Sequence, residues 1–142
     1  MSRILPFLLL LTIISACQSR KGNNGDLAIT NAWLRPAPEG GMSTLYFTIT
    51  NNRSTADTLL AIDLPISSNV EFHETRTQNG VSGMYPLGTR IPIPPHTRLV
   101  FKPGGKHVMI MGLQKALVSG DSLSATFHFA QAGKRMLKIP VR

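Results

Sequence analysis

Cysteine is almost absent from this chain of 142 residues: Cys17 is the only one, so no disulfide can form within the chain. A metal site in the folded part would therefore need ligands other than thiolate. Signals for helices are also scarce. The sequence shows no Cys-x-x-Cys pair, no catalytic triad and no paired carboxylates, and these absences argue against an enzyme.

Acidic residues are few as well. Seven Asp and Glu face fifteen Lys and Arg, which gives a formal net charge of +8. The basic residues are scattered singly, and there is little interleaving with aromatic residues. This pattern argues against nucleic-acid binding. A basic surface could instead steer an acidic partner towards the protein.

The N-terminal segment resembles the signal of a bacterial lipoprotein. Arg3 supplies a positive charge, and Ile4–Ile14 is apolar but too short to span a bilayer as a helix. Small residues then precede Cys17, as in a lipoprotein cleavage box. We therefore predict a signal peptide over residues 1–16 and lipidation of Cys17. The alternative is an ordinary secretory signal with an incidental cysteine.

The remaining chain divides into two parts. Residues 17–26 hold the lipidated cysteine and a polar, glycine-rich stretch that predicts a flexible tether. Residues 27–142 are enough for one folded domain without disulfides. We expect this domain to face the periplasm of a bacterial cell envelope, held at a membrane by its lipid anchor.

The sequence of the domain predicts an all-β fold. Short segments rich in β-branched and aromatic residues recur between Gly, Pro and Asn, which is typical of a sandwich. We predict about nine short antiparallel strands. They cover residues 28–34, 43–50, 58–64, 70–77, 81–87, 98–102, 107–111, 122–130 and 134–141.

One hairpin can be placed in register. Asn79-Gly80 is a strong signal for a two-residue turn, which puts Gln78 opposite Val81 and Thr75 opposite Met84. One face then carries His73, Thr75, Ser82 and Met84, whereas Val70, Phe72, Val81, Tyr85 and Leu87 form the other face, which we predict to be core. Met84 is therefore expected off the core face, as a diagonal neighbour of His73.

A second cluster of soft ligands follows a Pro-Gly-Gly turn. His107, Met109 and Met111 alternate along one strand and share a face. Thioether sulfur selects Cu(I), and imidazole also suits copper. Without carboxylate ligands, Mg²⁺, Ca²⁺ and hydrolytic zinc are disfavoured. We predict a Cu(I) site built from His73, Met84, His107 and Met109.

At these residues the sequence resembles the PCuAC family of periplasmic copper(I) chaperones. That family carries a histidine, a methionine eleven positions later and a distal His-x-Met, here His73, Met84, His107 and Met109; Pro103–Leu113 resembles its signature segment. The resemblance implies a cupredoxin-like Greek-key β-sandwich with a surface Cu(I) site. It also implies exchange of copper with an envelope protein, such as a cytochrome c oxidase subunit or its assembly factor.

Two features narrow these expectations. Glu74 stands where some members of the family carry methionine, and no His/Met-rich tail follows Arg142. We therefore expect one Cu(I) per chain, in a monomer, with Met111 and Glu74 as auxiliary residues near the metal.

Two other functions compete with this one. An electron-transfer cupredoxin needs a cysteine thiolate in its copper site, and the single cysteine is assigned to the anchor. A lipid-anchored sandwich without metal function, acting in adhesion or assembly, remains the alternative.

Overall fold

The computed structural model describes residues 27–142. The predicted signal peptide (residues 1–16), the lipidated Cys17 and the tether (residues 17–26) lie outside the described residues. All named elements of the described part are strands. They are β1 (Leu27–Leu34), β2 (Met42–Asn51), β3 (Asp57–Asp63), β4 (Asn69–Gln78), β5 (Val81–Pro86), β6 (Ile91–Ile93), β7 (Thr97–Phe101), β8 (Lys106–Met111), β9 (Ser122–Phe129) and β10 (Gly133–Pro140). Within residues 27–142, no helix is long and apolar enough to cross a membrane.

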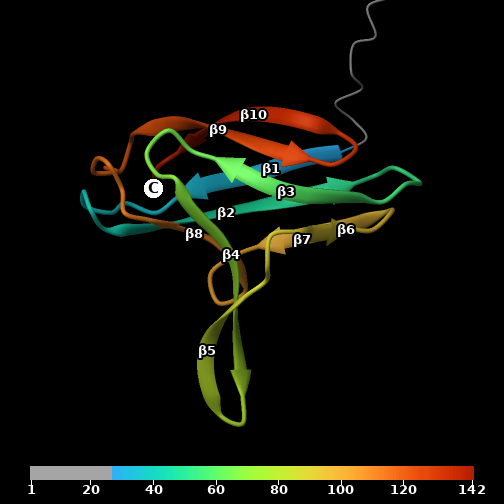
Figure 1. Ribbon diagram of the computed structural model, residues 1–142, viewed down its shortest axis with the longest axis horizontal. Helices are drawn as coiled ribbons and strands as arrows, with labels where there is room; N and C mark the ends of the chain where they lie inside the picture. The colour runs from blue at the N-terminus through green and yellow to red at the C-terminus, as the bar shows by residue number, and fades with distance from the viewer. Residues whose placement is uncertain (1–26) are drawn as a thin grey trace, which may run out of the picture.

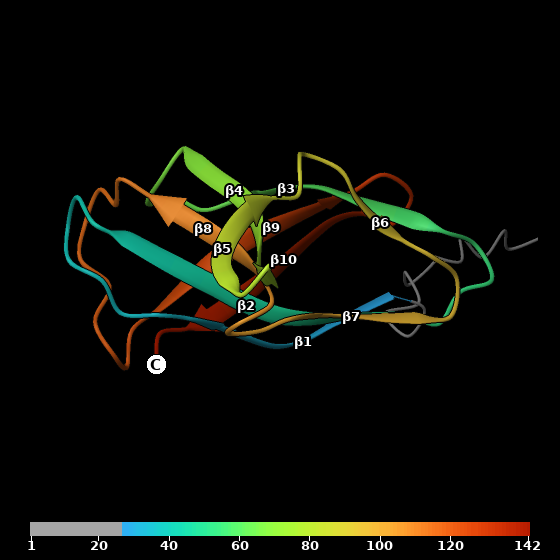
Figure 2. The same cartoon turned by 90° about the horizontal axis from the view of Figure 1, so that it is seen from below.

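The strands form two sheets that lie face to face (Figures 1 and 2). One sheet has six strands in the order β1-β2-β7-β8-β4-β5, and the other has four in the order β10-β9-β3-β6. Strand β2 pairs with β8 through its first half and with β7 through its second half. Almost all pairings are antiparallel; the exceptions include a single parallel pair that joins β7 to β8. The predicted β-sandwich is confirmed.

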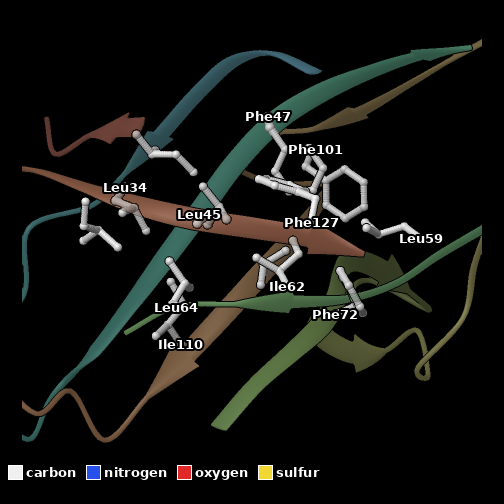
Figure 3. Close-up of a cluster of buried hydrophobic side chains, with 14 of the residues drawn as sticks. Leu34, Leu45, Phe47, Leu59, Ile62, Leu64, Phe72, Phe101, Ile110 and Phe127 are labelled. Carbon is white, nitrogen blue, oxygen red and sulfur yellow. The ribbon is translucent and has the colours of Figure 1, made fainter. Parts of the chain in front are cut away.

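Alternating apolar residues from both sheets fill the space between them (Figure 3). Phe47 on β2 stacks on Phe101 of β7 at 4.3 Å between ring centroids. Phe127 on β9 meets Phe47 edge-on from the opposite sheet, at 5.1 Å. Such offset and edge-on ring pairs stabilise a core beyond the area they bury. The core thus fixes the six-stranded sheet, which carries the predicted ligands on its other face.

All nine predicted strands are present, but a tenth was missed. Strand β6 is only three residues long and contains Pro92, and proline inside a short run argues against a strand. Pro92 is tolerated because β6 pairs only with β3, at the edge of the four-stranded sheet. The missing donor of proline then costs no ladder hydrogen bond on the open side.

The β4–β5 hairpin extends beyond the sandwich, as Figure 1 shows. Its predicted register is confirmed, with Gln78 opposite Val81 and Thr75 opposite Met84. The prediction that its second face is core is confirmed at the base of the hairpin, where Val70 and Leu87 pack against the core, and is wrong towards the turn. Phe72 is buried, but Val81 is 69% exposed, because pairing of β4 with β8 ends at Glu74. Past that point the hairpin is a two-stranded ribbon that no second sheet covers.

Candidate metal centre

The two predicted histidines face each other across neighbouring strands. His73 on β4 is paired with His107 on β8, and their ring centroids lie 6.0 Å apart. The residues before and after them, Phe72 and Val108, are paired with each other and point into the core. Side chains alternate along a strand, so both imidazoles lie on the outer face of the six-stranded sheet.

The two predicted methionines flank this histidine pair on the same face. Met109 lies two residues beyond His107 and opposite Glu71, which makes it a diagonal neighbour of His73. Met84 lies opposite Thr75 on β5, diagonal to His73 on the other side. Diagonal neighbours are roughly 7–8 Å apart, within reach of long side chains. Three adjacent strands therefore bring the imidazole of His107 and two thioethers around His73.

The imidazole of His107 is held in a defined tautomer. Its Nδ1 lies 2.9 Å from the carbonyl oxygen of Gly105. A carbonyl can only accept, so Nδ1 carries the hydrogen and Nε2 keeps its lone pair. The same carbonyl oxygen also accepts a hydrogen bond from the amide of Thr75, at 3.0 Å. The backbone before β8 therefore leaves Nε2 of His107 available to bind a metal.

A tight turn places this carbonyl. The amide of Gly105 donates to the carbonyl of Lys102 at 3.1 Å. Pro103 and Gly104 occupy the central positions, and Gly104 has a φ of +73°. This arrangement matches a type II turn, which favours proline first and requires a positive φ at the second central position.

We expect Gly104→Ala to destabilise the domain by about 1–2 kcal/mol, because only the backbone conformation opposes a side chain there. A Cβ at Gly104 would meet nothing within 4 Å. The matched control is Gly105→Ala, whose Cβ would make an ordinary contact 3.5 Å from Cγ of Lys102. Urea unfolding of both variants measures the difference. Equal midpoints would show that the turn does not depend on the left-handed conformation.

The imidazole of His73 has one nitrogen paired and one unpaired. Its Nε2 lies 3.0 Å from Oε2 of Glu71, two residues earlier on the same strand. Its Nδ1 is buried and has no hydrogen-bond partner among the described residues. A buried polar atom without a partner is costly, which makes Nδ1 of His73, beside a second imidazole, a candidate metal ligand. The sequence reading missed Glu71, although a carboxylate two residues from a histidine on a strand signals such a contact.

Exposure increases from one side of the site to the other. His107 is only 5% exposed, whereas Met84 is 58% exposed. The side chain of His73 lies between these extremes at 17%, and Met109 is half-buried. An incoming group therefore reaches the thioether of Met84 before it reaches the imidazoles.

The two expected auxiliary residues differ in position. Met111 lies on the same face as Met109, but opposite Asn69 and Met42, at the far end of β8 from the histidine pair. Glu74 does not lie with the ligands at all, because it is on the opposite face of β4 from His73. The structure therefore contradicts its prediction as an auxiliary residue near the metal.

The carboxylate of Glu74 belongs to a salt bridge instead. It accepts a hydrogen bond of 2.7 Å from Nζ of Lys106. This bond, together with the nearby charges of Lys106 and Arg76, outweighs partial burial and lowers the pKa of Glu74 below its ordinary value. Glu74 thus joins β4 to β8 on the other side of the sheet.

The remaining histidines lie elsewhere. His128 is on β9 in the other sheet and contacts Asp63 at 2.6 Å. His96 precedes β7 in a turn, with a φ of +52°. Within residues 27–142 no three side chains of His, Cys, Asp and Glu come together as a metal site. A donor set of two imidazoles and two thioethers would fit a soft monovalent metal.

Comparison with known proteins identifies relatives of this chain in sequence and in fold. Residues 27–141 match the LpqE-like family of predicted lipoproteins. The predicted lipoprotein Lxx21020 of Leifsonia xyli subsp. xyli is 28% identical over 130 residues, which is 91% of this chain and 78% of the relative. Protein RP573 of Rickettsia prowazekii is also 28% identical, over 113 residues, 77% of this chain and 62% of the relative.

Solved structures with the same fold include PCuAC domains. The copper-bound PCuAC domain from PmoF2 has a TM-score of 0.69 and 26% identity, covering 83% of this chain and 93% of that domain. The solution structure of CuI-DR1885 from Deinococcus radiodurans has a TM-score of 0.64 and 22% identity, over 87% and 85% of the two chains, and shows the fold alone. The chain therefore belongs to the LpqE-like family, and its domain has the fold of the PCuAC domains that its motifs resemble.

Proposed function

We propose that this protein is a copper(I) chaperone of the cell envelope, which binds one Cu(I) through His73, Met84, His107 and Met109 and passes it to a partner protein. One observation carries the proposal: among the hydrogen bonds of residues 27–142, the paired histidines each keep one ring nitrogen without a partner, between two thioethers on adjacent strands. The copper-bound state of the PmoF2 PCuAC domain supports the choice of metal.

The chemistry of the four side chains suits Cu(I) as cargo. Thioethers are soft ligands that prefer Cu(I), and neutral imidazole adds two nitrogen donors. Methionine cannot be lost to a disulfide in an oxidising compartment, unlike cysteine. All four ligands are neutral, so the bound ion keeps its positive charge and is held less tightly than by thiolates. This suits a protein that must release its metal.

The gradient of exposure suggests how release begins. A partner that approaches from solvent reaches Met84 first, because this side chain is 58% exposed and His107 is only 5% exposed. The partner's own ligand can replace Met84 while the buried imidazole still holds the ion. Exchange of ligands one at a time moves copper between proteins without releasing it into solution.

Position in the cell follows from the N-terminal signal. Lipidation of Cys17 would anchor the protein, and residues 17–26 would let the domain reach neighbouring proteins. The match to a family of predicted lipoproteins supports this part of the proposal. The partner is a copper-accepting or copper-donating envelope protein, and the resemblance to PCuAC chaperones favours the copper centre of cytochrome c oxidase or its assembly factor as recipient.

A Cu(I) titration tests the proposal. The chain from Ser19 onward, which keeps all described residues, is titrated under anaerobic conditions against a chromogenic Cu(I) chelator. We expect one equivalent of Cu(I) to be withheld from the chelator, without the strong visible absorption of a copper–thiolate site. Failure to compete with the chelator would contradict the proposal, and a lipid-anchored sandwich without metal function would be the better description.

A further inference from the structure

The carboxylate of Glu71 is placed to control which nitrogen of His73 binds metal. Glu71 and His73 are two residues apart on β4 and therefore share its outer face. Oε2 of Glu71 lies 3.0 Å from Nε2 of His73. An ionised carboxylate only accepts hydrogen bonds, so in the neutral imidazole the hydrogen sits on Nε2 and the lone pair on Nδ1.

The other nitrogen has the surroundings expected of a ligand atom. Nδ1 of His73 is buried without a hydrogen-bond partner among residues 27–142. The imidazole that faces it, His107, donates from Nδ1 to the Gly105 carbonyl and keeps its lone pair on Nε2. The two rings thus offer different nitrogens.

We infer that Glu71 is a positioning residue of the copper site, which presents Nδ1 of His73 to the metal while His107 binds through Nε2. This inference rests on the proposed function and adds to it the ligand atoms and the residue that selects one of them. A histidine ligand that donates its second N–H to a carboxylate is fixed in orientation and becomes a stronger donor. The two histidines therefore differ, since His107 has a neutral carbonyl in that place.

The carboxylate of Glu71 is not engaged by a lysine or arginine among residues 27–142, so it can hold the imidazole of His73. Its side chain is 50% exposed, and within the described part of the chain no lysine or arginine forms a salt bridge with it. Lys106, the one lysine or arginine on the neighbouring strand β8, donates a hydrogen bond to Glu74 on the other face of β4. Met109, a predicted ligand, is the residue opposite Glu71 on β8.

The ligand atoms can be read directly by nitrogen NMR. The chain from Ser19 onward, labelled with ¹⁵N at histidine, is studied without metal at about pH 8, above the ordinary imidazole pKa of about 6.5. We expect His73 as the Nε2–H tautomer. Ag(I), a redox-inert substitute for Cu(I), is then added. A one-bond coupling between silver and nitrogen should appear at Nδ1 of His73 and at Nε2 of His107.

Variants test the part played by the carboxylate. We expect Glu71→Leu to lose the single tautomer of His73 and to lower the Cu(I) affinity about 10- to 100-fold, the usual effect of removing the hydrogen-bond partner of a metal-binding histidine. Glu71→Gln keeps an acceptor oxygen and should keep the tautomer, with a smaller loss. The matched control is Glu74→Gln, which removes a carboxylate from the opposite face of the same strand and should change neither.

The outcomes separate this inference from the proposed function. Silver coupling at Nε2 of His73 would overturn the assignment of ligand atoms while leaving a copper chaperone in place. An unchanged tautomer and affinity in Glu71→Leu would overturn the role of the carboxylate alone. Absence of Cu(I) and Ag(I) binding in the unmodified chain would overturn the proposed function, and the metal-positioning role of Glu71 with it.

Discussion

Met109→Leu is expected to weaken Cu(I) binding by at least about 100-fold while leaving the domain folded. Loss of a ligand should exceed the roughly 10- to 100-fold effect of losing a ligand's hydrogen-bond partner. Leucine fills nearly the same volume, and swaps of this kind usually cost less than about 1.5 kcal/mol of stability. Anaerobic competition with a chromogenic chelator measures the affinity, and urea unfolding measures the stability.

Met136→Leu is the matched control for this substitution. Met136 lies on β10 in the other sheet and is 74% exposed, so its loss should leave both quantities unchanged. If Met109→Leu instead lowered stability strongly and left the affinity intact, Met109 would be a packing residue and the proposed ligand set would be wrong. The same comparison applies to Met84→Leu, where the 58% exposure of the side chain makes an effect on stability small.

The register of the β4–β5 hairpin could be predicted because the local chemistry determines it. A two-residue Asn-Gly turn fixes the pairing of both strands, and this pairing alone placed Met84 beside His73. The burial of the hairpin could not be predicted in the same way. Alternation shows which residues share a face, but whether that face is covered depends on contacts distant in sequence, such as the start of β8 at Lys106, which pairs with Glu74.

The immediate surroundings of the ligands were harder to predict than the ligands. Met84 and Met109 are recognisable by residue type, whereas Gly105 acts through a backbone carbonyl that no sequence pattern reveals. The salt bridge of Glu74 depends on its pairing with Lys106, 32 residues away. No short turn joins β4 to β8, so the sequence did not predict their pairing. Alternation along β4 already places Glu74 on the face opposite His73; it was named as an auxiliary residue only because some members of the resembled family carry methionine there.

A buried carboxylate far from the metal centre also escaped the sequence reading. Asp57 begins β3 and is 4% exposed. Its two oxygens accept hydrogen bonds from the backbone amides of Thr58, Gln131 and Ala132, at 2.7, 2.8 and 2.9 Å. Nη1 of Arg53 donates a fourth, at 3.1 Å. One side chain thus ties the start of β3 to the turn between β9 and β10.

We expect Asp57→Ala to lower the free energy of unfolding by about 3–5 kcal/mol, as is typical when one partner of a buried charged network is removed. Alanine would leave three amide donors and a guanidinium without their acceptor, and each unsatisfied buried group costs about 1–3 kcal/mol. The loss is a large share of the roughly 5–15 kcal/mol that stabilises an ordinary domain. Urea unfolding measures it as a shift of the midpoint.

Asp63→Ala is the control for this loss. Asp63 ends the same strand, but its carboxylate is 70% exposed and contacts only His128 among the hydrogen bonds and salt bridges of residues 27–142. An exposed pair of this kind contributes about 0–1 kcal/mol. Equal shifts in the two variants would show that the four donors around Asp57 find other acceptors. A folded fraction of Asp57→Ala should still bind Cu(I) with unchanged affinity, because Asp57 belongs to the other sheet and shares no contact with the ligands.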